Sequence, residues 1–259
     1  MWGEAAEGPD WRDAASYAPL LDADRSLFAW EWLRRDAGYR AAAARALSPS
    51  SAVAPAEPGP EHFGLVAFEP PGLAVPDAWP VWRSDAHAHV LSVSTAPASG
   101  PSQLDLFDLR PVAALARIVE RDRVQHLLLS DGFRCIRLDG PVGIFSNGPV
   151  CLRYEICGIA SAEPALLTLR RFLALCRTGR FSRGLHRREA RARRWILMLR
   201  ASDAMEAGAT QRDIAETLLR PSAGGPRWRT REPSARSQVQ RLVRSARTVA
   251  AGGYRAFLR

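Results

Sequence analysis

The spacing of apolar residues is helical at both ends of the chain and strand-like in the middle. Near the N-terminus, Phe28, Trp32 and Leu33 share one side of a helix that Ser26 would cap, and Asp36 would cap the next helix. A helical module of about 40 residues is small for independent stability, so we expect its aromatic residues to pack on another part of the protein or on a partner. These aromatic residues are Trp11, Tyr17, Trp30 and Trp32.

Between about residues 63 and 159 the pattern is that of β-strands. Residues 125–138 predict a hairpin, because Asp131 and Gly132 between the two runs favour a tight turn. Residues 150–157 alternate as a strand with one buried face does. The weaker strand candidates are residues 90–93 and 104–109, and Arg117–Arg123 is expected to be a short helix or a connection.

After Ser161 the helical period returns. We expect one helix from Ser161 to Gly179 and a second from about Arg187 to Glu206, and Thr210 with Asp213 resembles the capping box that starts a third. Along the first of these helices lie Leu166, Leu169, Leu173 and Cys176. The last helix is expected to begin at Ser234 and to stop at Gly252, with an apolar stripe of Val239, Leu242, Val243, Ala246, Val249 and Ala250.

These elements predict an α+β protein of three parts. A small N-terminal helical module spans residues 1–47, and a Pro- and Ser-rich linker follows over residues 48–60. A β-rich middle domain covers residues 61–160, and a C-terminal helical domain with a unit like a helix-turn-helix covers residues 161–259.

Charge separates the C-terminal third from the rest of the chain. All 36 basic residues are arginine, and the formal net charge is +9. Residues 170–259 hold 22 arginines against 6 acidic residues, a net charge of +16, whereas residues 1–169 carry −7. A GC-biased genome would also replace lysine by arginine without a functional reason, and we assign at least half of the preference to such codon bias. The uneven distribution nevertheless favours a polyanionic partner, and double-stranded DNA is the partner we expect.

The region from Gly208 to Ala215, followed by the arginine-rich helix from Ser234, looks like a helix-turn-helix. The usual turn has three or four residues, whereas about 14 lie between Leu219 and Ser234. Either this loop tucks Trp228 into the core and leaves a normal helix crossing, or the motif is only a resemblance.

The last helix places polar residues opposite its apolar stripe, and these are the expected DNA contacts. Arg241 and Arg244 suit guanine and Gln240 suits adenine, while Gln211 and Arg212 would reach phosphates. The complete predicted set is Gln211, Arg212, Arg236, Ser237, Gln240, Arg241, Arg244 and Arg247, with Thr248 on the same side. The alternative is an amphipathic helix whose arginines are merely solvated.

A further basic run, Arg187 to Arg194, would also suit phosphates. Positive charge at a helix start opposes the helix dipole, so either this helix begins earlier, near residues 181–186, or an anion relieves the repulsion.

Enzymatic chemistry has little support in the sequence. His87 and His89 would share one face of a strand and could bind a metal, but two imidazoles in a surface loop are the simpler interpretation. The four cysteines form no CxxC pair, and no catalytic or phosphate-binding motif accompanies the histidines, so we expect no catalytic residue, no metal and no cofactor. With no long apolar stretch and no secretion signal, we expect a cytoplasmic protein with no membrane contact.

The residues also resemble known families. The N-terminal module resembles a transcriptional-regulator-like module of proteobacteria (DUF6499-type) through Trp11-Arg12-Asp13, Trp30-Glu31-Trp32-Leu33-Arg34-Arg35 and Tyr39. The rest resembles a domain of unknown function numbered 2285 (DUF2285). Its matching stretches are His126-Leu127-Leu128-Leu129, Leu152-Arg153-Tyr154-Glu155, Leu169-Arg170-Arg171-Phe172-Leu173, Arg193-Arg194-Trp195-Ile196-Leu197, residues 208–215 and 239–244, and Gly252-Gly253-Tyr254-Arg255.

The resemblance implies a transcriptional activator that switches on the excision and transfer genes of an integrative and conjugative element, and a smaller antagonist of the same family that silences it. The β-rich domain would recognise a ligand, contact RNA polymerase, or orient the two ends of the chain. Two other function classes stay open: a protein-interaction module that binds and inhibits a related regulator without its own DNA site, and an enzyme acting on nucleic acid, which would depend on His87 and His89.

Overall fold

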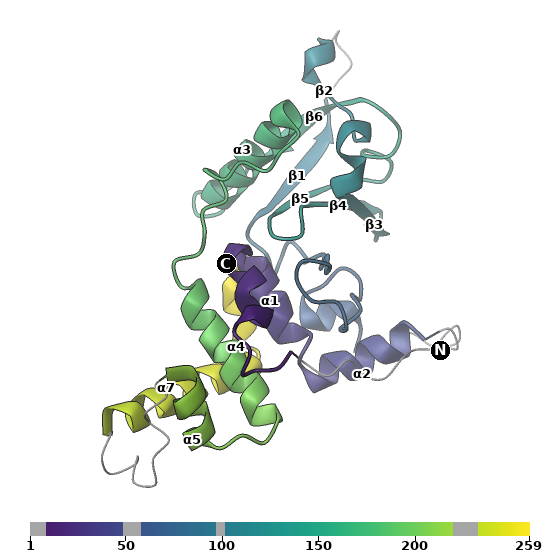
Figure 1. Cartoon of the computed structure of the whole chain (residues 1–259). Helices are drawn as coiled ribbons and strands as arrows, with labels where there is room; N and C mark the ends of the chain where they lie inside the picture. The colour runs from purple at the N-terminus through teal and green to yellow at the C-terminus, as the bar shows by residue number, and fades with distance from the viewer. Residues whose placement is uncertain (1–8, 49–57, 97–101, 220–232) are drawn as a thin grey trace.

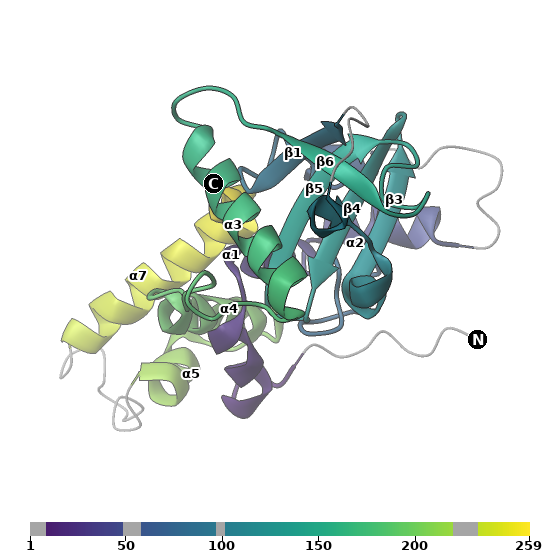
Figure 2. The same ribbon diagram turned by 90° about the horizontal axis from the view of Figure 1, so that it is seen from above.

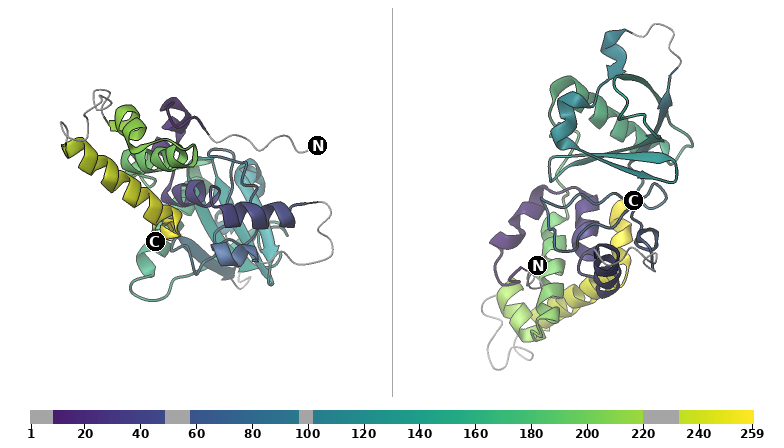
Figure 3. Two further views of the ribbon diagram at one scale, coloured as in Figure 1. Left: turned by 90° about the horizontal axis from the view of Figure 1, so that it is seen from below. Right: turned by 90° about the vertical axis from the view of Figure 1, so that its right-hand side faces the viewer.

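The computed structural model describes residues 9–48, 58–96, 102–219 and 233–259, and most of the predicted linker lies outside these ranges. A six-stranded sheet with helix α3 forms one part of the molecule, and the remaining α-helices form the other (Figure 1). Figure 3 shows that the helical part combines segments from both ends of the chain. The protein is therefore α+β, as predicted.

The sheet has the strand order β2-β6-β1-β5-β4-β3. β1 pairs in parallel with β5, and all other neighbouring strands are antiparallel. The strands are β1 (Val90–Thr95), β2 (Leu106–Phe107), β3 (Ala116–Arg121), β4 (Val124–Ser130), β5 (Cys135–Pro141) and β6 (Val150–Glu155).

The hairpin predicted over residues 125–138 is confirmed, with a longer turn than Asp131-Gly132 alone. Ser130 pairs with Cys135, so four residues connect β4 to β5. The Asp131 carboxylate accepts the N–H groups of residues 133 and 134, and Gly132 has a φ of +89°. A side chain at Gly132 would also lie 2.7 Å from Pro76, so both conformation and space require glycine here.

The prediction of a short helix or connection over Arg117–Arg123 is wrong, because this segment forms edge strand β3. All six of its residues pair with β4, from Ala116 opposite Leu129 to Arg121 opposite Val124. Asp122 and Arg123 make the turn with φ angles of 53° and 64°. A two-residue turn in which both φ angles are positive usually carries Asn or Gly. Asp122 and Arg123 lack this signal, so the sequence did not indicate a turn here.

Helix α3 (Ala162–Thr178) covers one face of the sheet and ends at Gly179, as predicted. The predicted apolar stripe does not face the sheet, however: Leu166 and Leu173 are 43% and 37% exposed, Cys176 is exposed, and only Leu169 packs partly against the core. The side chains that do face the sheet are Ala165, Thr168, Phe172 and Leu175. Both sides of α3 carry apolar residues. The contact between Phe172 and Phe107, whose ring centroids lie 5.0 Å apart, selects the side that faces the sheet.

The opposite face of the sheet is covered by the irregular segment before β1. Arg137 on β5 is 1% exposed and holds this segment in place. Its guanidinium donates to the Trp82 carbonyl at 3.1 Å and pairs with Asp139 at 2.8 Å. This arginine is therefore part of the fold and is not available for a partner.

The helical part begins with a 3₁₀ helix (Ala15–Asp22), α1 (Arg25–Leu33) and α2 (Ala37–Ala46). The Asp36 cap of α2 is confirmed, since its carboxylate accepts the Tyr39 N–H at 2.7 Å. The N-cap of α1 is Asp24 and not Ser26. The backbone N–H of Asp24 donates to Phe133 and its carboxylate accepts from Cys135, which ties the start of α1 to the β4–β5 hairpin.

The partner surface expected for the N-terminal aromatic residues is the C-terminal end of the same chain. Trp11, Tyr17, Trp30 and Trp32 share one core with α4 (Ala192–Glu206), α7 (Pro233–Ala250) and the 3₁₀ helix Gly253–Leu258. Phe257 lies 4.5 Å from Trp195 and 6.5 Å from Phe28 between ring centroids. The first and last helices thus form a single hydrophobic core.

Polar contacts join the same segments. Asp203 on α4 accepts from Arg35 at 2.7 Å and from the Tyr17 hydroxyl at 2.5 Å. Burial alone would raise the pKa of Glu31, but the charges of Arg35 and Arg34 outweigh it and hold that pKa below its usual value. These ties span up to 186 positions in the sequence and fix α4 relative to the N-terminal helices.

Among the described helices, none combines the length and apolar character needed to cross a lipid bilayer.

Candidate nucleic-acid interface

A tight turn connects α4 to the next helix, α5 (Gln211–Ile214). Gly208 in this turn has a φ of +75°. The capping box is confirmed: the Thr210 hydroxyl accepts the Asp213 N–H, and the Asp213 carboxylate accepts the Thr210 N–H at 2.8 Å. The hydrogen bond from the Thr210 side chain holds the pKa of Asp213 below its usual value.

The helix continues from α5 as a π-helical turn over Ala215–Leu219. Ile214 and Ala215 are fully buried in the core that also contains Val239 of α7. They anchor α5 against α7, so the two helices form one packed unit with α4. The loop over residues 220–232, including Trp228, lies outside the described residues.

Helix α7 extends away from the sheet (Figure 2). Its buried side contains Val239, Val243 and Ala246, as the sequence predicted, and Leu242 and Val249 are partly buried. Ala250 is exposed, contrary to the predicted stripe, because it lies in the last turn of the helix. The helix starts at Pro233, one residue before the prediction, and Gly252 follows its end with a φ of +100°.

The opposite side of α7 gathers the predicted DNA contacts into one row. All are exposed except Gln240, which is half-buried. The residues in this row, which we call the α7 polar face, are Arg236, Ser237, Gln240, Arg241, Arg244, Arg247 and Thr248. An α-helix of this length spans about 27 Å, and a helix is the element that the DNA major groove admits.

The arginines of the α7 polar face differ from several arginines that tie the helices to one another. Within the described ranges, no carboxylate lies within salt-bridge distance of Arg236, Arg241, Arg244 or Arg247. By contrast, arginines at the junctions between helices are paired, as Arg35 is with Asp203. The α7 polar face therefore presents uncompensated positive charge, which suits phosphates and guanine edges.

Gln211 and Arg212, the other predicted contacts, are exposed at the first turn of α5. They belong to the same packed unit as the α7 polar face but to a different helix. The first turn of a helix also presents free backbone N–H groups, which favour an anion.

The second basic run is arranged differently from the prediction. Helix α4 starts only at Ala192, so it begins neither at Arg187 nor at residues 181–186. Glu189 accepts the backbone N–H of Arg191 at 3.1 Å and holds the preceding residues in a turn. Arg187, Arg191, Arg193 and Arg194 are all exposed, but only the last two lie in the first turn of α4. The conflict with the helix dipole is therefore smaller than the sequence implied.

The histidine pair is not a pair of surface histidines. His87 is only 7% exposed, and its ring centroid lies 5.9 Å from that of His89. Burial lowers the pKa of His87 to about 3, so the ring is neutral at physiological pH. In the part of the chain that the structure describes, no three His, Cys, Asp or Glu side chains gather as a metal site would need.

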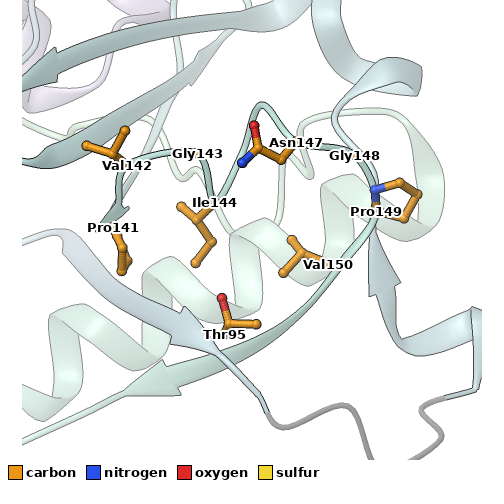
Figure 4. Close-up of a pocket in the computed structure, with 9 residues that line it drawn as sticks. All are labelled: Thr95, Pro141, Val142, Gly143, Ile144, Asn147, Gly148, Pro149 and Val150. Atoms are coloured by element: carbon orange, nitrogen blue, oxygen red, sulfur yellow. The ribbon is translucent and has the colours of Figure 1, made fainter.

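A surface hollow of about 240 Å³ lies where β5 and β6 meet the end of β1 (Figure 4). Asn147 and Thr95 supply its polar side chains, and the rest of its lining is Pro141, Val142, Gly143, Ile144, Gly148, Pro149 and Val150. None of these side chains titrates at ordinary pH, so the hollow offers no general acid or base of the usual kind.

Comparison with known families gives matches at both ends of the chain. Residues 10–64 match a family described as a proteobacterial transcriptional regulator-like domain. Residues 160–259 match a family described as "T6SS, Transcription factor, DNA binding domain". No curated protein and no solved structure matches the chain.

These matches support a DNA-binding protein of a transcription-regulator family. The second match contains α4, α5 and the whole α7 polar face. Both families are described by regulation or DNA binding and not by a catalytic activity.

Proposed function

We propose that this protein regulates transcription by placing α7 in the major groove of a specific DNA site. The observation that carries the proposal is a row of exposed arginines on one side of a helix whose other side is anchored in the core; no carboxylate among the described residues pairs with them. The match of residues 160–259 to a DNA-binding domain favours this role over a merely solvated amphipathic helix.

In this proposal the residues of the α7 polar face have different roles. Arg241 and Arg244 each donate a bidentate pair to guanine, and Gln240 serves adenine. Arg236 and Ser237 act near the N-terminal end of the helix, where base contacts concentrate. Arg247 lies at the edge of the α7 polar face.

Gln211 and Arg212 contact phosphates together with the backbone N–H groups that start α5. Phosphate contacts position a protein on DNA, whereas base contacts select the sequence.

The regulated genes follow only from the resemblance to DUF2285 proteins with a DUF6499-type module. On that basis we propose an activator of the excision and transfer genes of an integrative and conjugative element. RNA polymerase and a small antagonist of the same family are the protein partners in this proposal.

The test is a binding titration of the full chain against the DNA upstream of the surrounding genes, at two salt concentrations and with random duplex as competitor. Selective retention of one region at about 150 mM salt would support the proposal. Equal retention of all duplexes that vanishes with salt would contradict it. Co-purification with a partner and no retention on DNA at any salt would instead favour the protein-interaction module.

Replacing Arg241 by Ala tests the assignment of base contacts. We expect the variant to lose about 1–3 kcal/mol of discrimination at one base pair, because a bidentate contact to guanine is lost. The readout is the affinity for a panel of single-base variants of the bound site. Arg110→Ala is a matched control, since Arg110 is 82% exposed in the sheet part and should leave the preference unchanged. Unchanged preference in Arg241→Ala would remove Arg241 from base recognition.

A further inference from the structure

A second site lies at the junction of the helical part and the sheet. A cavity of about 100 Å³ opens between the start of α1, the segment before β1, the first residue of β5, and α3. Its lining includes Asp24, His87, His89, Cys135 and Arg171, with Arg187 also present. Segments from both parts of the molecule therefore enclose it.

Two histidines, one of them deeply buried, line this cavity. His87 is 93% buried, and within the described ranges its Nδ1 atom has no hydrogen-bond partner; the same holds for Nδ1 of His89. Both rings are neutral, because burial lowers the pKa of each imidazole. A buried polar atom without a partner costs free energy, and such atoms are commonly satisfied by a water or a ligand.

Arg171 on α3 supplies positive charge to the same cavity. Its Nε atom donates to the Leu185 carbonyl at 3.0 Å, and no described carboxylate lies within salt-bridge distance of its guanidinium. Burial lowers the pKa of Arg171, which the charge of Asp24 only partly offsets. The guanidinium is thus half-buried without a matching anion.

The carboxylates of the cavity already have partners. Asp24 accepts the Cys135 N–H at 2.8 Å and lies 3.3 Å from Nδ1 of His186. Glu189 lies 3.7 Å from Arg25 and accepts the Arg191 N–H. Arg187 is exposed and, in the described part of the chain, forms no ion pair. Among the lining residues that the structure describes, Arg171 and Arg187 are thus cations without an ion-pair partner.

We propose that this cavity binds a small oxyanion of about the size of phosphate, held by Arg171 and the His87 imidazole, with Arg187 at the entrance. The planar guanidinium of arginine matches the oxygen atoms of such an anion. A volume of about 100 Å³ holds a few waters or a small anion and is well below that of pockets for larger ligands. The site is separate from the α7 polar face and does not depend on DNA binding.

Thermal unfolding of the full chain without DNA tests this proposal, because a ligand that binds only the folded state raises the Tm. Sodium phosphate, sulfate and acetate would each be added at low millimolar concentration and compared with sodium chloride of equal ionic strength. We expect a saturable rise in Tm with phosphate, and the sulfate and acetate series reveal whether a tetrahedral or a carboxylate anion is preferred. At low concentration the general stabilising effect of phosphate and sulfate salts is small.

Three variants locate the anion. Arg171→Gln should lose the phosphate-dependent rise, whereas Arg170→Gln, an exposed neighbour on α3, should keep it. Arg241→Gln should also keep it, because Arg241 lies on the α7 polar face. The shift is measured for each variant against its own Tm in chloride, so a lower starting stability does not affect the comparison.

A second measurement covers the case in which Arg171→Gln fails to fold. Side-chain nitrogen NMR of the wild-type protein should show a phosphate-dependent change at His87 and none at the exposed His62. The proposal is overturned if phosphate acts no differently from chloride, or if Arg171→Gln retains the full shift. A shift that disappears only in Arg241→Gln would place the anion on α7 and would also overturn it.

Discussion

At the scale of single residues, one buried network ties distant parts of the chain together. Asp203 joins Arg35 and Tyr17, and its partners lie 168 and 186 positions away. Tyr17 has a raised pKa, because burial and the neighbouring Asp203 charge both disfavour its ionised form. A carboxylate in this position holds two N-terminal elements against α4.

Replacing Asp203 by Ala should lower the free energy of unfolding by about 1–3 kcal/mol, because Arg35 would keep only Glu31 as its ion-pair partner and the Tyr17 hydroxyl would lose its 2.5 Å acceptor. Urea denaturation measures this loss. Glu206→Ala on the same helix is the matched control, since its pair with Arg40 is exposed and should contribute less than about 1 kcal/mol. Equal effects of the two substitutions would show that the Asp203 network does not hold the N-terminal helices in place.

His87 should make stability depend on pH. In the unfolded chain this histidine takes up a proton below about pH 6.5. In the folded protein it does so only near its pKa of about 3, because burial, followed by the charges of His89, Arg137 and Arg171, disfavours the protonated ring. The contribution of neutral His87 to the free energy of unfolding is thus fully present above the pKa of the unfolded chain. It is lost as the pH falls, at about 1.4 kcal/mol per pH unit.

Chemical denaturation between pH 7 and pH 4 measures this dependence. His87→Gln should flatten the slope relative to wild type, whereas His62→Gln should not, because His62 is exposed. If His87→Gln follows the wild-type slope, another group causes the acid sensitivity.

At the scale of secondary-structure elements, α3 shows how packing decides between two apolar faces. Phe172 is 1% exposed and lies against Phe107, while its neighbour Leu173 is 37% exposed. The periodicity of the sequence could not distinguish them, because apolar residues recur at helical spacing on both sides.

Substitutions at these two neighbours should therefore have very different effects. Phe172→Ala should cost about 3–5 kcal/mol through the cavity that it leaves, and Leu173→Ala less than about 1 kcal/mol. Both are measured by denaturation under the same conditions. A large loss for Leu173→Ala would mean that the outer face of α3 is covered in solution.

At the scale of the whole molecule, the C-terminal helices do not have a core of their own. Val239, Val243 and Ala246 of α7 share their core with Trp11, Tyr17 and Trp30 from the other end of the chain. The helix that presents the α7 polar face is therefore positioned by residues that precede the sheet.

A fragment of residues 161–259 should consequently fail to fold cooperatively, because it lacks much of the surface that buries α4 and α7. Circular dichroism during heating measures this, with the full chain as control. Co-expression with a fragment of residues 1–160 should restore a cooperative transition. A sharp transition in the isolated 161–259 fragment would show that these helices are self-sufficient.

The sequence by itself determined the features that depend on neighbouring residues. The hairpin at Asp131 and Gly132, the caps at Asp36 and Thr210, and the apolar and polar sides of α7 follow from local conformation and periodicity. For the same reason the sequence could indicate the row of residues on α7 that forms the candidate site.

Tertiary structure alone decided the rest. It made Arg117 and its neighbours an edge strand, chose the buried face of α3, and joined α1 to α4 and to the final 3₁₀ helix Gly253–Leu258. It also enclosed His87 beside Arg171 at the junction of the two parts. These outcomes depend on contacts between residues far apart in the sequence, whose free energy of burial no local pattern contains.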